Sequence, residues 1–141
     1  MAIVYFDSSA FVKLVVEEDG SELAARLWDG CDAAVSSRFA YPEVCAALAA
    51  ARRDHRLTAT ELRRAGTRWE EFWSAIRPVE LTEAVTAAAG RLAGEHTLRG
   101  ADAVHLASLL AVGRTAAIFA VWDERLRAGA RAVGVRVVPR S

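Results

Sequence analysis

Short runs of consecutive apolar residues alternate along this chain with longer segments in which apolar residues recur every three or four positions. An uninterrupted apolar run bounded by polar turn residues is typical of a strand that is buried in a parallel sheet. The stretch 78–81 favours an edge strand or a connector, because Pro78 has no backbone N–H for a central ladder. The predicted buried strands lie at 3–6, 32–36, 116–122 and 135–138.

The periodic segments between these runs predict amphipathic helices, and several of them begin at polar residues. Ser21 and Thr82 are expected to cap the helices that follow them, and Ser36 or Ser37 is expected to start the third helix. The polar stretch 94–100 predicts a turn. The predicted helices cover 10–16, 21–30, 37–53, 60–75, 82–92, 101–110 and 124–132.

The alternation of strands and helices indicates the α/β class, in which helices that connect parallel strands cover both faces of the sheet. We therefore expect a mostly parallel sheet of four to five strands, in a single domain that spans residues 1–141. A chain of 141 residues is long enough to bury about two thirds of its unfolded surface without disulfides or metals.

Composition indicates the cellular compartment of this domain and limits its contacts with membranes and nucleic acid. Cys31 and Cys45 have no close Cys or His neighbour in the sequence, which argues against a zinc site or a disulfide framework and favours a reducing cytoplasm. The first apolar run is too short for a signal sequence or a membrane span, so we expect a cytoplasmic protein without membrane contact. Acidic and basic residues number 18 each, so any contact with nucleic acid has to be local.

Four carboxylates stand where the predicted fold brings strand ends and helix starts together. Asp7 and Asp123 directly follow apolar runs, whereas Glu43 and Asp102 lie in the first turns of predicted helices. Clustered carboxylates repel one another, and a divalent cation relieves that repulsion. Oxygen ligands select Mg²⁺ or Mn²⁺ over zinc or copper, and a carboxylate-held Mg²⁺ most often serves chemistry at phosphorus. The four acids therefore favour metal-dependent hydrolysis of a phosphodiester.

Two other functional classes stay open at this point. A receiver-like domain that accepts a phosphoryl group also gathers acids at strand ends, although no acidic pair precedes Asp7 and no lysine follows a late strand. A catalytically silent binding module would carry the same acids too far apart to share an ion. Each acid taken alone is also an ordinary helix cap or a partner of the helix dipole.

The order of four short motifs resembles a known family. An apolar strand followed by Asp7-Ser8-Ser9 comes first, and Glu43 then opens a helix. The later motifs are Arg99-Gly100-Ala101-Asp102-Ala103-Val104-His105-Leu106-Ala107 and Trp122-Asp123-Glu124-Arg125-Leu126. In this order and with these spacings, the chain resembles the PIN-domain ribonucleases over essentially its whole length. It is most similar to the VapC toxins of bacterial type II toxin–antitoxin modules.

The resemblance implies a PIN-like three-layer α/β/α fold and an Mg²⁺- or Mn²⁺-dependent endoribonuclease that acts on RNA as a toxin. It also implies a homodimer, and a VapB-type antitoxin protein whose tail enters the active-site groove. Ser8 or Ser9 matches the family's hydroxyl that orients a carboxylate or a metal-bound water. The catalytic and metal-binding acids of the family are matched, by position, by Asp7, Glu43, Asp102 and Asp123.

Several residues in these motifs have two interpretations. The Asp123 match is the loosest, because Val121-Trp122 stand where many relatives carry a small hydroxyl residue. Trp122 stacks on a base or packs inside the chain, and packing is favoured. Arg99 grips a substrate phosphate or pairs with a neighbouring acid. His105 is a general acid or, in better agreement with its apolar helix, a hydrogen-bonded core histidine.

Overall fold

The structure, a computed structural model, describes residues 2–140 and is built around one five-stranded sheet. The strands lie in the order β3-β2-β1-β4-β5, and every neighbouring pair is parallel. The expected parallel sheet is therefore confirmed, with the Pro78 strand at its edge. The strands are β1 (Ile3–Phe6), β2 (Ala33–Ser37), β3 (Arg77–Val79), β4 (Ala117–Ala120) and β5 (Val137–Val138).

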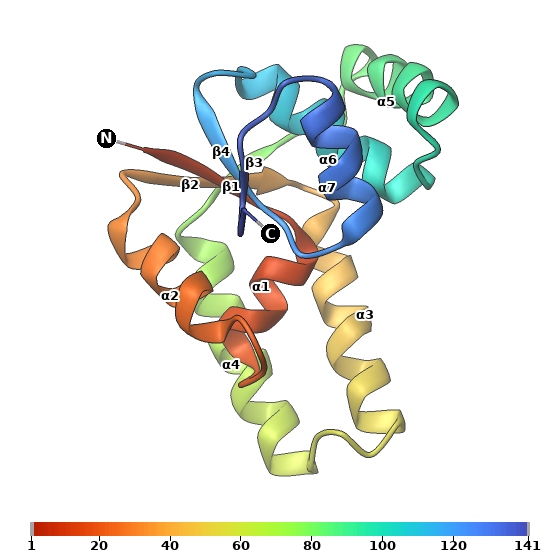
Figure 1. The fold of residues 1–141 in the computed structure, drawn as a ribbon. Coiled ribbons are helices and arrows are strands. Elements are labelled where there is room, and N and C mark those ends of the chain that lie inside the picture. The colour runs from red at the N-terminus through yellow and green to blue at the C-terminus, as the bar shows by residue number, and fades with distance from the viewer. Residues whose placement is uncertain (1, 141) are drawn as a thin grey trace.

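Helices cover both faces of this sheet, so the fold has the expected three layers (Figure 1). The helices are α1 (Ser8–Val15), α2 (Ser21–Gly30), α3 (Ala40–Arg53), α4 (Ala59–Ser74), α5 (Glu83–His96), α6 (Gly100–Val112) and α7 (Glu124–Ala132). Helices α1 to α4 pack on one face of the sheet, and α5 to α7 pack on the other. The lower ends of α3 and α4 extend well beyond the sheet (Figure 1).

The central strand β1 contributes to both of the resulting cores. Successive side chains of a strand point to opposite faces, so Val4 and Phe6 join the α1–α4 side and Tyr5 joins the α5–α7 side. On the first side Trp69 is buried, with its ring centroid 4.9 Å from that of Phe11. Full burial of such a side chain contributes roughly 1.5–3 kcal/mol. Packing from both faces fixes β1 and with it the residue that follows the strand.

The start of α3 differs from the expectation. Ser36 and Ser37 both belong to β2 and are fully buried, and the helix begins only at Ala40. Ser36 Oγ donates to the carbonyl of Phe6 at 2.6 Å, and Ser37 Oγ accepts from the backbone N–H of Phe39 at 3.1 Å. The prediction was wrong because β3 pairs with β2 up to its last residue and keeps both serines in the strand.

Two helix ends also differ from the expectation. Gly20, with φ at +94°, is the N-cap residue of α2, and Ser21 is the first helical residue instead of the cap. Helix α5 continues through part of the predicted turn to His96 and ends at Thr97, which is left-handed with φ at +53°. The longer helix packs along α6, and this packing outweighs the low helix propensity of Gly94.

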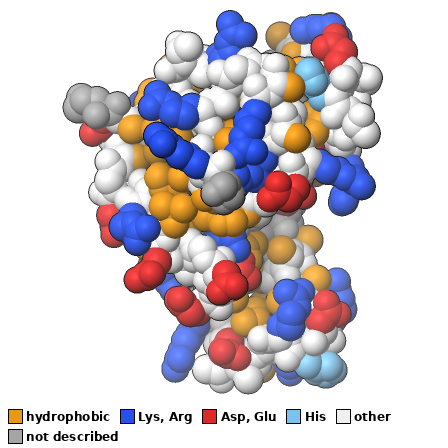
Figure 2. Space-filling model, viewed as in Figure 1, with side chains coloured by type: hydrophobic (Ala, Val, Ile, Leu, Met, Phe, Trp, Pro, Cys, Tyr) orange, Lys and Arg blue, Asp and Glu red, His pale blue; other side chains and the backbone are white. Residues whose placement is uncertain are grey.

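The surface and the thiols agree with the compositional picture. Both basic and acidic side chains occur over the face drawn in Figure 2, and the two kinds are equal in number in the sequence. Cys31 and Cys45 are both free thiols. Within residues 2–140, no helix is both long enough and apolar enough to cross a membrane.

Candidate functional site

Asp7 lies at the carboxyl end of the central strand and begins α1 as its N-cap residue. Its Oδ1 accepts hydrogen bonds from the Ala10 backbone N–H at 3.0 Å and from Ser9 Oγ at 2.6 Å. The side chain is only 4 % exposed, and this burial raises the pKa of Asp7 to about 6. The negative charge of Glu43 acts in the same direction, so these two acids are neighbours.

Glu43 lies in the first turn of α3 and points back toward α1 and α6. Its Oε1 accepts from Ser8 Oγ at 2.5 Å and lies 2.5 Å from His105 Nε2. The glutamate side chain is 24 % exposed, whereas the histidine side chain is 3 % exposed. One oxygen of Glu43 is thus held by two side chains that come from two other helices.

Asp102 and Asp123 form a second pair of neighbouring acids at the same edge of the sheet. Partial burial raises the pKa of Asp102, and the negative charge of Asp123 raises it further. Asp123 is the N-cap residue of α7, and its Oδ1 accepts from the Leu126 backbone N–H at 2.9 Å. The His105 ring opposes the rise in pKa for both Asp7 and Asp102, so one side chain of α6 acts on a member of each acid pair.

The three polar candidates beside the acids lie as follows. Ser8 holds Glu43, and Ser9 holds Asp7 while its Oγ also accepts from the backbone N–H of Trp122 at 3.2 Å. Arg99 is exposed at the N-cap position of α6, and its guanidinium lowers the pKa of Asp102 as one of the smaller effects. Within residues 2–140, Arg99 forms no ion pair, so its contact with a phosphate stays a prediction.

Trp122 packs against the acidic turn between α1 and α2. The ammonium of Lys13 lies 5.3 Å from the centroid of the tryptophan ring, and it also donates to Glu18 at 3.0 Å. Gly20 lies so close that a Cβ atom at this position would stand 2.8 Å from Trp122 Nε1. The ring is therefore an intramolecular packing element that ties this turn to the loop before Asp123.

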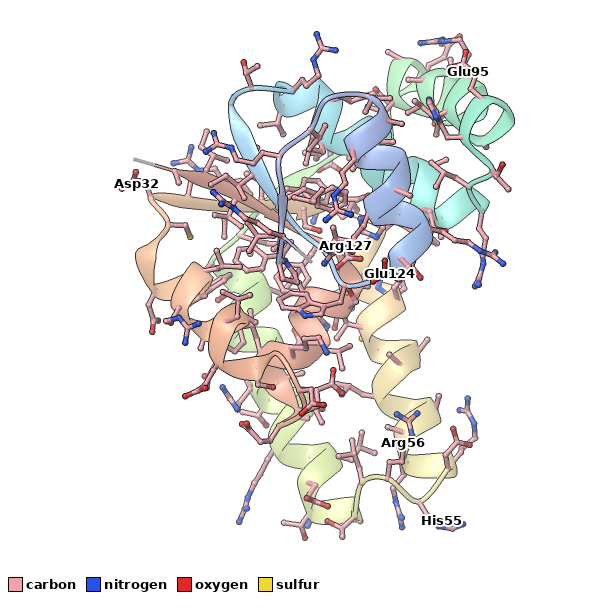
Figure 3. All side chains as sticks on the ribbon, viewed as in Figure 1. Asp32, His55, Arg56, Glu95, Glu124 and Arg127 are labelled. Atoms are coloured by element: carbon pink, nitrogen blue, oxygen red, sulfur yellow. The ribbon has the colours of Figure 1, made fainter. Side chains whose placement is uncertain are left out.

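Two further residues of this region, Tyr5 and Arg127, were not expected from the sequence. Tyr5 is fully buried, and its hydroxyl lies 2.8 Å from His105 Nδ1; the only sequence signal was a hydroxyl inside an apolar strand. Arg127 reaches from α7 toward the strands (Figure 3), is 2 % exposed and donates to the Val121 carbonyl at 3.3 Å. The Nε of Arg127 has no hydrogen-bond partner among the described residues, so this buried guanidinium is held mainly by the Val121 carbonyl.

The oxygen ligands of the four acids suit a hard divalent cation, but their side chains are spread apart. Their oxygen donors lie at one edge of the sheet, and burial, with a smaller contribution from the neighbouring acid, raises the pKa of Asp7 and of Asp102. Within the described part of the chain, however, no three His, Cys, Asp or Glu side chains stand close enough to hold one ion. The side chains therefore have to draw together if the two pairs are to share a metal.

Comparisons with known proteins agree with this architecture. The PIN domain family model matches residues 4–130 of the chain. Ribonuclease VapC49 of Mycobacterium tuberculosis is 65 % identical over 139 residues, which cover 99 % of this chain and 96 % of that protein.

Two solved structures share the fold at low sequence identity. Mycobacterium tuberculosis VapC20, described as a sarcin-ricin loop cleaving toxin, superposes with a TM-score of 0.68 at 17 % identity, covering 95 % of this chain and 96 % of the other. VapBC2 from Rickettsia felis, solved with a DNA fragment from its promoter, gives a TM-score of 0.66 at 11 % identity and covers 96 % of each chain. The family match and the close relative lead to one conclusion: this chain belongs to the PIN-domain family, in its VapC branch.

Proposed function

We propose that this protein is an Mg²⁺- or Mn²⁺-dependent endoribonuclease and the toxin of a VapBC-type pair. The observation that carries the proposal is the presence of two carboxylate pairs, Asp7 with Glu43 and Asp102 with Asp123, at the carboxyl edge of the sheet, with the pKa of buried Asp7 raised to about 6. The 65 % identical relative is named a ribonuclease, and PIN-domain ribonucleases generally use divalent metal ions. The family match leaves no support for a receiver-like phosphoryl acceptor.

The proposed metal ligands are Asp7, Glu43, Asp102 and Asp123. When bound, the ion would lower the pKa of a water and offset negative charge on the phosphate and the leaving oxygen. Ser9 holds Oδ1 of Asp7 and Ser8 holds Oε1 of Glu43. The other oxygen of each of these two carboxylates makes no hydrogen bond within residues 2–140 and is available as a ligand. The exposed Arg99 guanidinium, beside Asp102, would bind a phosphate of the RNA.

RNA cleavage with and without metal tests this proposal directly. Purified protein incubated with structured RNA should cut it when Mg²⁺ or Mn²⁺ is present and should stop in excess EDTA. Restoring Mg²⁺ to the chelated sample controls for damage to the protein. The same ions should raise the melting temperature, since a ligand that binds only the folded state stabilises it. Cleavage that survives EDTA would exclude the metal mechanism. A melting temperature indifferent to both ions would favour the catalytically silent module.

We also propose a VapB-type antitoxin as the protein partner and the cytoplasm as the site of action. The support is the 65 % identity to a VapC protein and the shared fold with a member of a VapBC complex. The net charge of zero agrees with a partner that binds through local contacts and not through long-range electrostatic attraction.

A homodimer is the further part of this proposal, and an apolar groove supports it. Phe39 and Leu81 are the large apolar side chains that the described residues leave exposed, at 36 % and 46 %. They line a groove of about 580 Å³ together with Trp73. Exposed apolar surface of this kind is typical of interaction sites. We assign the groove to a second copy of the chain.

Leu81→Asp is expected to convert the dimer to a monomer, because a charge among the residues that line the groove would have to be buried unpaired. Light scattering coupled to gel filtration measures the molar mass, and circular dichroism checks the fold. Ala59→Asp adds the same charge at the first residue of α4, which is the other end of this helix from Trp73. It is the matched control and should remain dimeric. A dimer that persists in Leu81→Asp, or wild-type protein that is monomeric, would contradict this assignment.

A further inference from the structure

A buried chain of hydrogen bonds leads from the central strand to Glu43. The Tyr5 hydroxyl lies 2.8 Å from His105 Nδ1, and His105 Nε2 lies 2.5 Å from Glu43 Oε1. These three residues come from β1, α6 and α3, and Tyr5 and His105 are 0 % and 2 % exposed. Both ring nitrogens of the histidine are therefore engaged, and the ring is closed off from solvent.

The hydrogen bonds of the neighbours give this chain a direction. The Tyr5 oxygen accepts from the Ser37 backbone N–H at 3.0 Å, and burial raises the pKa of Tyr5, so its hydroxyl keeps its proton. Glu43 Oε1 accepts from Ser8 Oγ, and a carboxylate oxygen can only accept from His105 Nε2 as well, so the Nε2 proton faces Glu43.

We propose that His105, oriented by Tyr5, is a positioning residue that holds the Glu43 carboxylate at the acidic site. The inference rests on the proposed function, because Glu43 is one of the four metal ligands that this function requires. The geometry excludes direct contact between His105 and substrate, since the ring is buried beneath Glu43 and Tyr5. Without the ring, Oε1 of the partly exposed Glu43 would keep only the Ser8 hydroxyl and could turn to solvent.

The position of the donor atom distinguishes positioning from core packing. His105→Gln places an amide N–H near the former Nε2 and can still reach Glu43. His105→Asn carries its amide near the former Nδ1, so it can contact Tyr5 but falls short of Glu43. His105→Leu fills the space with no donor. A pure packing role predicts similar losses for the glutamine and asparagine variants, whereas positioning predicts rescue by glutamine alone.

The experiment compares these three variants with wild type in kcat, KM and the Mn²⁺ concentration that gives half of the melting-temperature shift. We expect His105→Asn and His105→Leu to lose about 10- to 100-fold in kcat or in Mn²⁺ affinity, as for other residues that orient a metal ligand. KM for RNA should stay unchanged, and His105→Gln should recover most of the loss. Equal values for all three variants would overturn the proposal.

A spectroscopic measurement tests the orientation without any turnover. In ¹⁵N-labelled wild type, the imidazole signals of His105 should report a protonated Nε2. Tyr5→Phe removes the partner of Nδ1 and should change this pattern while leaving the aromatic packing in place. A wild-type protein whose Nε2 carries no proton would overturn the proposal. Wild type that fails to cleave RNA would instead overturn the proposed function, and the ¹⁵N signals would still decide how His105 is held.

Discussion

Asp7→Asn is expected to lower RNA cleavage by about 10²–10³-fold or more, the range seen when one electrostatic group of a catalytic site is removed. Asp7 lies at the end of the central strand and brings the most deeply buried of the four carboxylates to the site. An amide cannot supply the negative charge that a divalent cation requires. It can, however, still accept from the Ala10 N–H and from Ser9, so the start of α1 should stay in place.

The measurement is the initial rate of cleavage of one RNA at saturating Mg²⁺ or Mn²⁺, with circular dichroism and gel filtration as checks of folding. Asp54→Asn makes the same chemical change at the exposed far end of α3 and serves as the matched control. It should cleave at the wild-type rate. An Asp7→Asn variant that cleaves as fast as wild type would move the chemistry away from this edge of the sheet.

The same substitution is expected to stabilise the metal-free protein at neutral pH. The pKa of Asp7 is raised from its usual 3.8 to about 6, so ionised Asp7 costs the folded state about 3 kcal/mol. The cost is absent below about pH 4, where the carboxyl is protonated in both states; it grows as pH rises toward 6 and is complete above that value. Asparagine carries no charge at any pH and avoids it.

Urea unfolding in EDTA at several pH values between 4 and 8 measures this effect. The free energy of unfolding of Asp7→Asn should exceed that of wild type by roughly 1–3 kcal/mol at pH 8, and the two should converge near pH 4. Saturating Mn²⁺ should reverse the order, because the ion stabilises the protein that binds it more tightly, and the variant lacks one of the four proposed ligands. A difference that does not change with pH would mean that Asp7 is not the source of the cost.

The sheet and the location of the acids were predictable because a buried parallel strand needs apolar side chains on both faces. An apolar run has to end where the chain leaves the sheet. The residues that follow the runs 3–6 and 116–122 therefore mark the carboxyl edge of the sheet. The prediction could not say which acids are neighbours. The pairing of Asp7 with Glu43 and of Asp102 with Asp123 depends on strand order and on helix packing, which periodicity does not encode.

The errors have the same origin. Ser36 and Ser37 have the composition of a helix start, but pairing with β3 keeps them in a strand. His105 was correctly expected to be a hydrogen-bonded core histidine, yet its partners lie 62 and 100 residues away in the sequence. No local pattern points to Tyr5, because a tyrosine in an apolar strand is normally explained by the packing of its ring. Long-range side-chain contacts were therefore the part that required the structure.

The close approach of Gly20 to Trp122 restricts how this sequence can diverge. Position 20 needs both a left-handed backbone and the absence of a Cβ atom, since that atom would stand 2.8 Å from the tryptophan ring. A smaller residue at position 122 would remove the contact but not the strain of the left-handed backbone, so glycine should persist at position 20 wherever position 122 is tryptophan. A turn that carries none of the four acids thereby limits which residues evolution can place next to Asp123.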